Sequence, residues 1–155
     1  MYLVDTNVIS ESRKGAKADA GVRRFFKNVM QQDDAIYVSV ITIGELRRGV
    51  EIIRHRGDSP QAEKLERWLD RVTEDYADSI LSFDEEMAQI WGKLRVPNHE
   101  HALDKQIAAT ALIHDLTVVT RNTIDFEATG VRILNPFKSL KNGVLHGDAI
   151  RTVER

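Results

Sequence analysis

The first five residues constrain this chain more than any other stretch, because they place an acid at the end of a short apolar strand. Tyr2, Leu3 and Val4 are typical of a buried strand, and Asp5 follows directly. A buried carboxylate is costly unless another group pairs with it. The carboxyl end of a strand is also where open α/β sheets bind ligands. The sequence therefore predicts a functional site at this edge, beginning with Asp5.

The length and composition indicate a single soluble domain. The chain has 155 residues, 42% of them hydrophobic, which is enough for one well-formed core. It has no cysteine, which excludes disulfides and thiolate metal sites. Its apolar runs are too short to cross a bilayer and its N-terminus lacks a signal pattern, so we expect a cytoplasmic protein without membrane contact. The net charge of −2 identifies no partner by itself.

Short apolar strands alternate with amphipathic helices along the chain. Strands are predicted at residues 2–4, 35–41, 79–83, 116–120 and 131–134, and helices at residues 8–13, 18–30, 42–56, 59–72, 84–94 and 103–112. This alternation predicts a three-layer α/β/α sandwich with a central, mostly parallel five-stranded sheet. We expect one domain over residues 1–137 and a C-terminal tail over residues 138–155, where no periodicity is clear.

Four acids stand at comparable positions in this pattern. Asp5 follows the first strand, and Glu45 lies in the first turn after the second. Asp104 begins a helix of small residues, and Asp125 comes just after the fourth strand. Asp104 shares a helical face with Ile107, so its carboxylate leans over the apolar side. Because parallel strands end at one edge of a sheet, we expect the four carboxylates to converge there.

Each of these acids also has a purely structural interpretation. Asp5 can cap the helix that follows it. The spacing from Thr42 to Glu45 fits a capping box, in which the glutamate bonds back to the start of its own helix. Asp125 can cap a turn. Asp104 can stabilise a helix start from any face, although its apolar neighbours make this the weakest of the four alternatives.

Several carboxylates in one site repel each other, and a hard divalent cation relieves that repulsion. Mg²⁺ or Mn²⁺ is expected, because both prefer oxygen ligands. No histidine is placed like a zinc ligand: His99 and His101 fall in a loop and His55 on a polar helix face, where we expect them to be solvated. A carboxylate-only site of this kind indicates phosphate-ester chemistry with a metal-activated water.

Five segments together resemble the PIN-domain family, specifically its VapC-type toxins and their FitB-like branch. They are residues 2–10, 39–46, 104–111, 119–126 and 135–137, so the resemblance covers residues 1 to about 137. It implies a PIN fold and a metal-dependent endoribonuclease that is the toxin of a type II toxin–antitoxin system. It further implies a structured RNA substrate cut at a single-stranded loop, with tRNA the leading choice, a cognate DNA-binding antitoxin, and a homodimer.

The resemblance also assigns roles to the acids. Asp5, Glu45 and Asp104 match the family's three acidic positions. Many relatives have an acid where Asn122 stands, whereas the FitB-like branch often has asparagine there and an acid at the position of Asp125. All four acids are therefore implied to be catalytic, with Asp5, Asp104 and Asp125 as metal ligands. Asn122 is implied to support the site, because its carbonyl oxygen can contact a metal or its waters.

Other side chains are expected to support the site or bind RNA. Thr6 matches a supporting hydroxyl of the family. RNA needs a basic approach to an acidic site, and Arg121 is the strongest expected phosphate contact. Arg47 and Arg48 are expected to contribute from the helix that carries Glu45. For the more distant arginines of that helix, a solvated face with intrahelical ion pairs is the better interpretation.

Other functions fit fewer of these residues than a nuclease does. A non-catalytic PIN-fold module that regulates with a DNA-binding partner is the main alternative, although the presence of all three principal acids argues against lost catalysis. An aspartate-based phosphatase needs a second aspartate two residues after the first, where Asn7 stands. A receiver domain needs an acceptor aspartate after the middle strand and a lysine after a later one, and neither pattern is clear.

Overall fold

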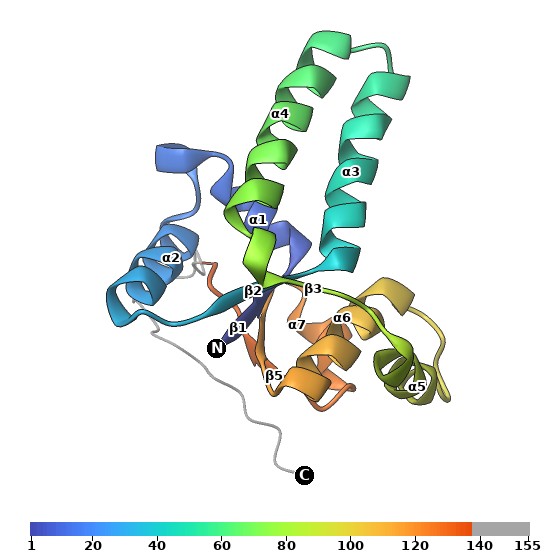
Figure 1. Cartoon of the computed structure of the whole chain (residues 1–155). Helices are drawn as coiled ribbons and strands as arrows, with labels where there is room; N and C mark the ends of the chain where they lie inside the picture. Colours follow the sequence, from blue (N-terminus) through green and yellow to red (C-terminus); the bar gives the residue numbers. More distant parts are fainter. Residues whose placement is uncertain (138–155) are drawn as a thin grey trace.

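Five parallel strands form the centre of the fold (Figure 1). The computed structural model describes residues 1–137, so the predicted C-terminal tail lies outside the described residues. The strands are β1 (Tyr2–Val4), β2 (Ile36–Ser39), β3 (Ile80–Leu81), β4 (Thr117–Val119) and β5 (Arg132–Leu134). Their order in the sheet is β3-β2-β1-β4-β5, and every neighbouring pair is parallel. The predicted five-stranded α/β sandwich is confirmed, and β1 lies at its centre.

Helices cover both faces of this sheet. They are α1 (Thr6–Ser12), α2 (Ala20–Gln32), α3 (Val40–His55), α4 (Ser59–Asp75), α5 (Glu85–Leu94), α6 (Ala102–His114) and α7 (Thr123–Glu127), with short 3₁₀ helices η1 (Gly15–Lys17) and η2 (Ala77–Ser79). The long helices α3 and α4 form an antiparallel pair that projects beyond the sheet (Figure 1). No helix within residues 1–137 is both long and apolar enough to cross a membrane.

The core is divided by the sheet into two clusters. Successive side chains of β1 point to opposite faces, so Val4 joins one cluster and Leu3 the other. The Val4 cluster contains buried residues of α1 to α4, among them Val8, Val22, Phe25, Val50 and Leu69. The Leu3 cluster contains buried residues of α6 and α7, among them Ile107, Ala108, Ala111 and Phe126. Both clusters are anchored on β1 and β4, which fixes the carboxyl ends of these two strands.

The secondary structure departs from the prediction most clearly in three segments. The second strand ends at Ser39, two residues before the predicted end, because the Ser39 side chain caps α3 by accepting a hydrogen bond from the Ile41 backbone. The β-branched residues Val40 and Ile41 favour a strand but lie in the first turn of the helix. The third strand has only two paired residues. Residues 123–127, for which no helix was predicted, form α7.

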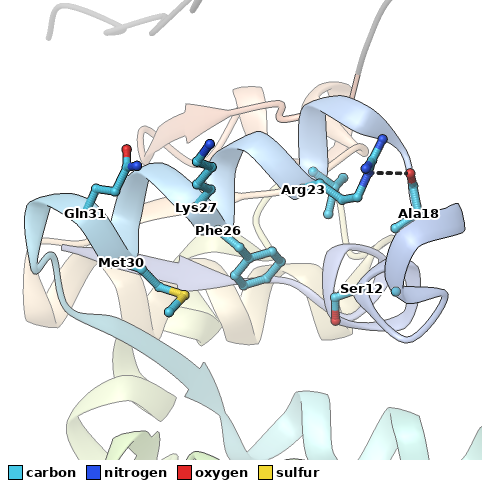
Figure 2. Close-up of a pocket in the computed structure, with 9 residues that line it drawn as sticks. Ser12, Ala18, Arg23, Phe26, Lys27, Met30 and Gln31 are labelled. Carbon is cyan, nitrogen blue, oxygen red and sulfur yellow. Dashed lines mark hydrogen bonds between the residues drawn. The ribbon is translucent and has the colours of Figure 1, made fainter.

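An apolar hollow of about 490 Å³ lies beside α2 (Figure 2). Its wall is formed by residues of α1, η1 and α2 and of the segment between them: Ser12, Gly15, Ala18, Val22, Arg23, Phe26, Lys27, Met30 and Gln31. Phe26 and Met30 provide large apolar side chains, and the Met30 residue is 82% exposed. An exposed methionine beside an apolar hollow is a feature of protein-binding surfaces.

Candidate functional site

Asp5 is held in place by three hydrogen-bond donors at the end of β1. Its Oδ1 accepts from the Thr6 backbone at 2.8 Å, and its Oδ2 accepts from Thr120 Oγ1 at 2.8 Å and from Asn7 Nδ2 at 3.2 Å. The residue is only 2% exposed. Asp5 therefore caps α1, as its structural interpretation predicts. Burial raises the pKa of Asp5, the three hydrogen bonds lower it, and the nearby charge of Asp125 raises it further.

Thr120 and Asn7 connect the end of β1 to the end of β4, a framework that the sequence analysis missed. Thr120 is fully buried, and its Oγ1 accepts from the Asn122 backbone at 3.0 Å and from Asn7 Nδ2 at 3.3 Å. Asn7 Oδ1 accepts from the Arg121 backbone at 3.0 Å. The signal in the sequence was a hydroxyl at the end of a strand that the sheet places beside β1. These contacts fix the segment that leads to Asp125.

Glu45 is oriented by Thr6 and not by its own helix. Thr6 Oγ1 donates to Glu45 Oε1 at 2.8 Å. The capping-box interpretation is wrong, because Ser39 caps α3 and Thr42 is buried inside the helix. Burial raises the pKa of Glu45, the Thr6 hydrogen bond lowers it, and the charge of Asp5 raises it. The Thr6 hydroxyl thus supports an acid, as the sequence analysis expected.

Asp104 carries the most perturbed carboxyl of the group. It lies in the first turn of α6, above the buried side chains of Ile107 and Ala108. Burial raises its pKa to about 7, with further increases from the charges of Asp5, Asp125 and Glu45 and a decrease from His101. The four acids therefore act on one another electrostatically, and the predicted convergence is present in the structure. Asp125 reaches the cluster from α7, where it is partly exposed.

His101 is the main departure from the sequence-based picture of the site. It is exposed, as predicted, but its side chain lies beside the carboxylates of Asp104 and Asp125. Its Nε2 lies 3.6 Å from Asp125 Oδ1. One donor atom of each of His101, Asp104 and Asp125 lies within 4.8 Å of the other two. The sequence predicts no histidine placed like a zinc ligand and a solvated His101 in a loop, so it does not anticipate this group. His99, in the same loop, is exposed and lies outside this group.

The remaining predicted residues differ in their exposure and in what their side chains contact. Asn122 caps α7 without a side-chain hydrogen bond to the helix, and its side chain is exposed. Arg121 follows β4 directly, and its guanidinium stacks 3.7 Å above the Phe137 ring. Arg47 forms ion pairs with glutamates of α3 and α4, so its charge is largely compensated. Arg48 is exposed on α3 and has no ion pair within the described part of the chain.

This donor set fits a hard divalent cation. Carboxylates that raise one another's pKa carry unfavourable repulsion when ionised, and a cation among them removes it. The oxygen donors available from Asp5, Asp104 and Asp125 are those that Mg²⁺ and Mn²⁺ prefer. Glu45 stands beside them with Oε1 engaged by Thr6.

Comparison with known proteins identifies the family. A PIN domain model matches residues 2–131. The chain belongs to the PIN-domain family. It is 36% identical to "Toxin FitB" of Neisseria gonorrhoeae, with 88% of this chain and 99% of that protein aligned. It is 35% identical to "VapC ribonuclease Y4jK" of Sinorhizobium fredii, with 89% and 99% aligned. The predicted likeness to FitB and VapC toxins is thereby confirmed.

Solved structures of PIN-domain proteins share the fold. The FitAcB crystal structure from Neisseria gonorrhoeae matches with a TM-score of 0.75 at 36% identity, covering 88% of this chain and 98% of that one. The structure of FitAB bound to an IR36 DNA fragment matches with a TM-score of 0.76 at 33% identity, covering 90% and 97%. The sheet at whose edge the four acids meet is therefore the PIN sheet.

The raised pKa of Asp104 predicts a specific dependence of stability on pH. Because the folded-state pKa of about 7 lies above the ordinary aspartate value of about 4, the metal-free protein loses stability as the pH rises from about 4 to about 7, and the loss is complete above that range. Asp104→Asn removes that loss. In EDTA we expect the variant to be more stable than wild type at about pH 8, on the order of 2 kcal/mol after allowance for solvent screening, and nearly equal to it at about pH 4. Denaturant unfolding at both pH values measures this.

Asp5→Asn provides the matched contrast. Its new amide group would face the Asn7 and Thr120 donors, so we expect the free energy of unfolding to fall by roughly 1–3 kcal/mol at about pH 8. If the stabilities of wild type and Asp104→Asn depended equally on pH, the electrostatic account of the site would be contradicted.

Proposed function

We propose that this protein is a Mg²⁺- or Mn²⁺-dependent endoribonuclease and the toxin of a type II toxin–antitoxin system, acting in the cytoplasm. The observation that carries the proposal is the convergence of Asp5, Glu45, Asp104 and Asp125 at one edge of a PIN sheet. The similarity to a FitB toxin and to a VapC ribonuclease supports it.

The acids have separate roles in the proposed hydrolysis of the phosphodiester bond. Asp5, Asp104 and Asp125 would hold the cation, which when bound supplies a Lewis acid and a water of lowered pKa. Asp5 is the rigid ligand because three donors fix its carboxylate. Glu45 would accept the proton of the attacking water, since burial has moved its pKa upwards and Thr6 orients it. As the water oxygen bonds to phosphorus, the bond to the leaving RNA oxygen breaks, and that oxygen takes a proton from solvent.

The form of the RNA follows from the shape of the site. The acids lie at the edge of a sheet, so the RNA strand must be drawn out of a duplex for one of its phosphates to reach them. A-form duplexes hide their base edges in a deep groove, whereas loops allow a strand to be splayed. We therefore propose cleavage at a single-stranded loop of a structured RNA, with tRNA the leading choice. Arg121 is the best-placed phosphate contact, because its stacking on Phe137 holds the guanidinium beside the end of β4.

Purified protein should cleave a hairpin RNA in its loop and leave a perfect duplex of equal length intact. EDTA should abolish cleavage, and Mg²⁺ or Mn²⁺ should restore it. Asp104→Asn, which is expected to fold well, should lose activity by roughly a hundredfold or more because a charged ligand is gone. Full activity of this variant, or equal cutting of hairpin and duplex, would contradict the assignment. Partner and DNA binding without any RNA cleavage would support the non-catalytic regulator instead.

A binding experiment with the same hairpin separates RNA recognition from catalysis. Arg121→Ala should weaken RNA binding and make its salt dependence shallower, because fewer counterions are released on binding when a phosphate contact is lost. Arg48→Ala should have a smaller effect, and Arg47→Ala the least, since its charge is already paired. An unchanged salt slope in Arg121→Ala would show that this arginine does not contact phosphate.

The proposed protein partner is a cognate antitoxin, a small DNA-binding protein. Relatives of this fold have been solved as toxin–antitoxin complexes, including FitAB with DNA. We propose that an apolar segment of the antitoxin occupies the hollow beside α2, where Phe26 and Met30 provide the apolar contact (Figure 2). Arg23 and Lys27, exposed at its rim, favour acidic residues flanking that segment. An arginine of the antitoxin can pair with Asp5 or Asp104 and compete with the cation.

Homodimerisation is proposed on separate grounds. Leu103 and Ile124 are large apolar side chains that precede Asp104 and Asp125, and they are 48% and 80% exposed. Exposed apolar side chains that flank a polar site are typical of surfaces covered by another protein. A second copy of this chain is the proposed occupant, and the RNA would then enter beside the dimer interface.

A charge placed in the hollow should weaken the antitoxin complex without affecting RNA cleavage. Met30→Glu puts a carboxylate against the apolar segment, and we expect at least about a tenfold loss of affinity. Asn28→Glu is the matched control, because Asn28 is exposed on the same helix but does not line the hollow. Calorimetry with the protein encoded by the adjoining reading frame measures both. Equal affinities for the two variants would exclude the hollow as the docking surface.

A further inference from the structure

His101 occupies a position at the start of α6 that helix capping does not explain. It is the N-cap residue of the helix, yet its side chain makes no capping hydrogen bond. Its backbone is left-handed, with φ 55° and ψ 44°, a region that few residues other than glycine adopt and in which asparagine, aspartate and histidine are enriched. This conformation, together with the helical spacing to Asp104, places the imidazole on the same side as the acid.

Hydrogen bonds on both sides of His101 fix the backbone at the start of α6. The buried Lys105 side chain donates to the Asn98 carbonyl, which ties the loop before His101 to α6. Trp91 Nε1 on α5 donates to the Ala102 carbonyl at 2.9 Å. On the opposite side, α7 is anchored by the fully buried Phe126, which follows Asp125. The imidazole and the two carboxylates are therefore brought together by separate, well-anchored elements.

The distances suit a shared cation better than a direct bond. The 3.6 Å between His101 Nε2 and Asp125 Oδ1 is too long for a good hydrogen bond. The three donor atoms within 4.8 Å of one another leave room for an ion between them. Imidazole is a ligand of first-row transition metals, whereas Mg²⁺ strongly prefers oxygen. A nitrogen in the donor set therefore changes which cation the site prefers.

We infer that His101 is a nitrogen ligand of the catalytic cation beside Asp104 and Asp125, and that the site therefore selects Mn²⁺ over Mg²⁺. This inference rests on the proposed function, because it concerns the same cation. It adds a ligand that the carboxylate-only description of the site lacks. It also gives the loop before α6 a role in metal choice.

The test is metal binding by the purified full-length protein, without any nuclease assay. His101→Asn keeps a residue that tolerates the left-handed backbone and replaces the nitrogen by an amide oxygen. Calorimetry at fixed pH should show that wild type binds Mn²⁺ about tenfold or more tightly than Mg²⁺. The variant should lose roughly tenfold in Mn²⁺ affinity and much less in Mg²⁺ affinity. His99→Asn, in the same loop but outside the donor group, should behave as wild type.

A spectroscopic probe and a second variant complete the test. The visible absorption of bound Co²⁺ reports nitrogen ligation, so the spectrum should shift in His101→Asn and not in His99→Asn. His101→Gly, which accepts the left-handed backbone but offers no ligand, should also lose the preference for Mn²⁺. An unchanged ratio of Mn²⁺ to Mg²⁺ affinity in both His101 variants would overturn the inference and leave the proposed function intact. Failure of wild type to bind either cation would instead overturn the proposed function.

Discussion

The hydrogen bond from Thr120 to Asp5 is the interaction on which the rest of the site depends. It joins the end of β1, the central strand of the sheet, to the end of its neighbour β4 through a 2.8 Å contact between two buried residues. Asn7 reinforces it by bonding to Asp5, to Thr120 and to the backbone of Arg121. Because the segment after β4 leads into α7, this small network also sets the position of Asp125.

The same network forces like charges together. Asp5 cannot move away from Asp104 and Asp125 without losing three hydrogen bonds, and the two other acids are anchored by helices packed on the core. The repulsion is visible in the raised pKa of Asp104. A fold that holds acids in this way stores unfavourable energy that a divalent cation releases on binding. We regard this coupling of a rigid frame to a repulsive cluster as the physical basis of the proposed nuclease.

The sequence was sufficient to predict the sheet and the convergence of the acids, because both follow from short periodic patterns. Strand β1 and Asp5 could be predicted from an apolar run that ends in an acid, and Asp104 from its spacing to the buried face of α6. The remaining features depend on contacts between distant segments. Neither the Thr6–Glu45 bond nor the approach of His101 to Asp125 has a local signature, since each joins elements that meet only in the folded sheet.

The errors at β2 and α7 have different origins, one local and one tertiary. Val40 and Ile41 have a high preference for strands, but one side-chain cap at Ser39 outweighed that preference. Helix α7 is a single short helix whose stability comes from burying Phe126 and not from its own sequence. Local propensity therefore predicted the elements with strong periodicity and failed where a helix cap or tertiary packing determined the backbone.

The central claim, that a divalent cation replaces a proton within this cluster of carboxylates, is tested most directly by counting protons released on metal binding. Calorimetric titration with Mn²⁺ or Mg²⁺ in buffers of different ionisation enthalpy gives that number. With the pKa of Asp104 raised to about 7, binding at about pH 7 should release a substantial fraction of a proton. The release should vanish at about pH 9 and fall sharply in Asp104→Asn. Metal binding at about pH 7 without proton release would contradict the account.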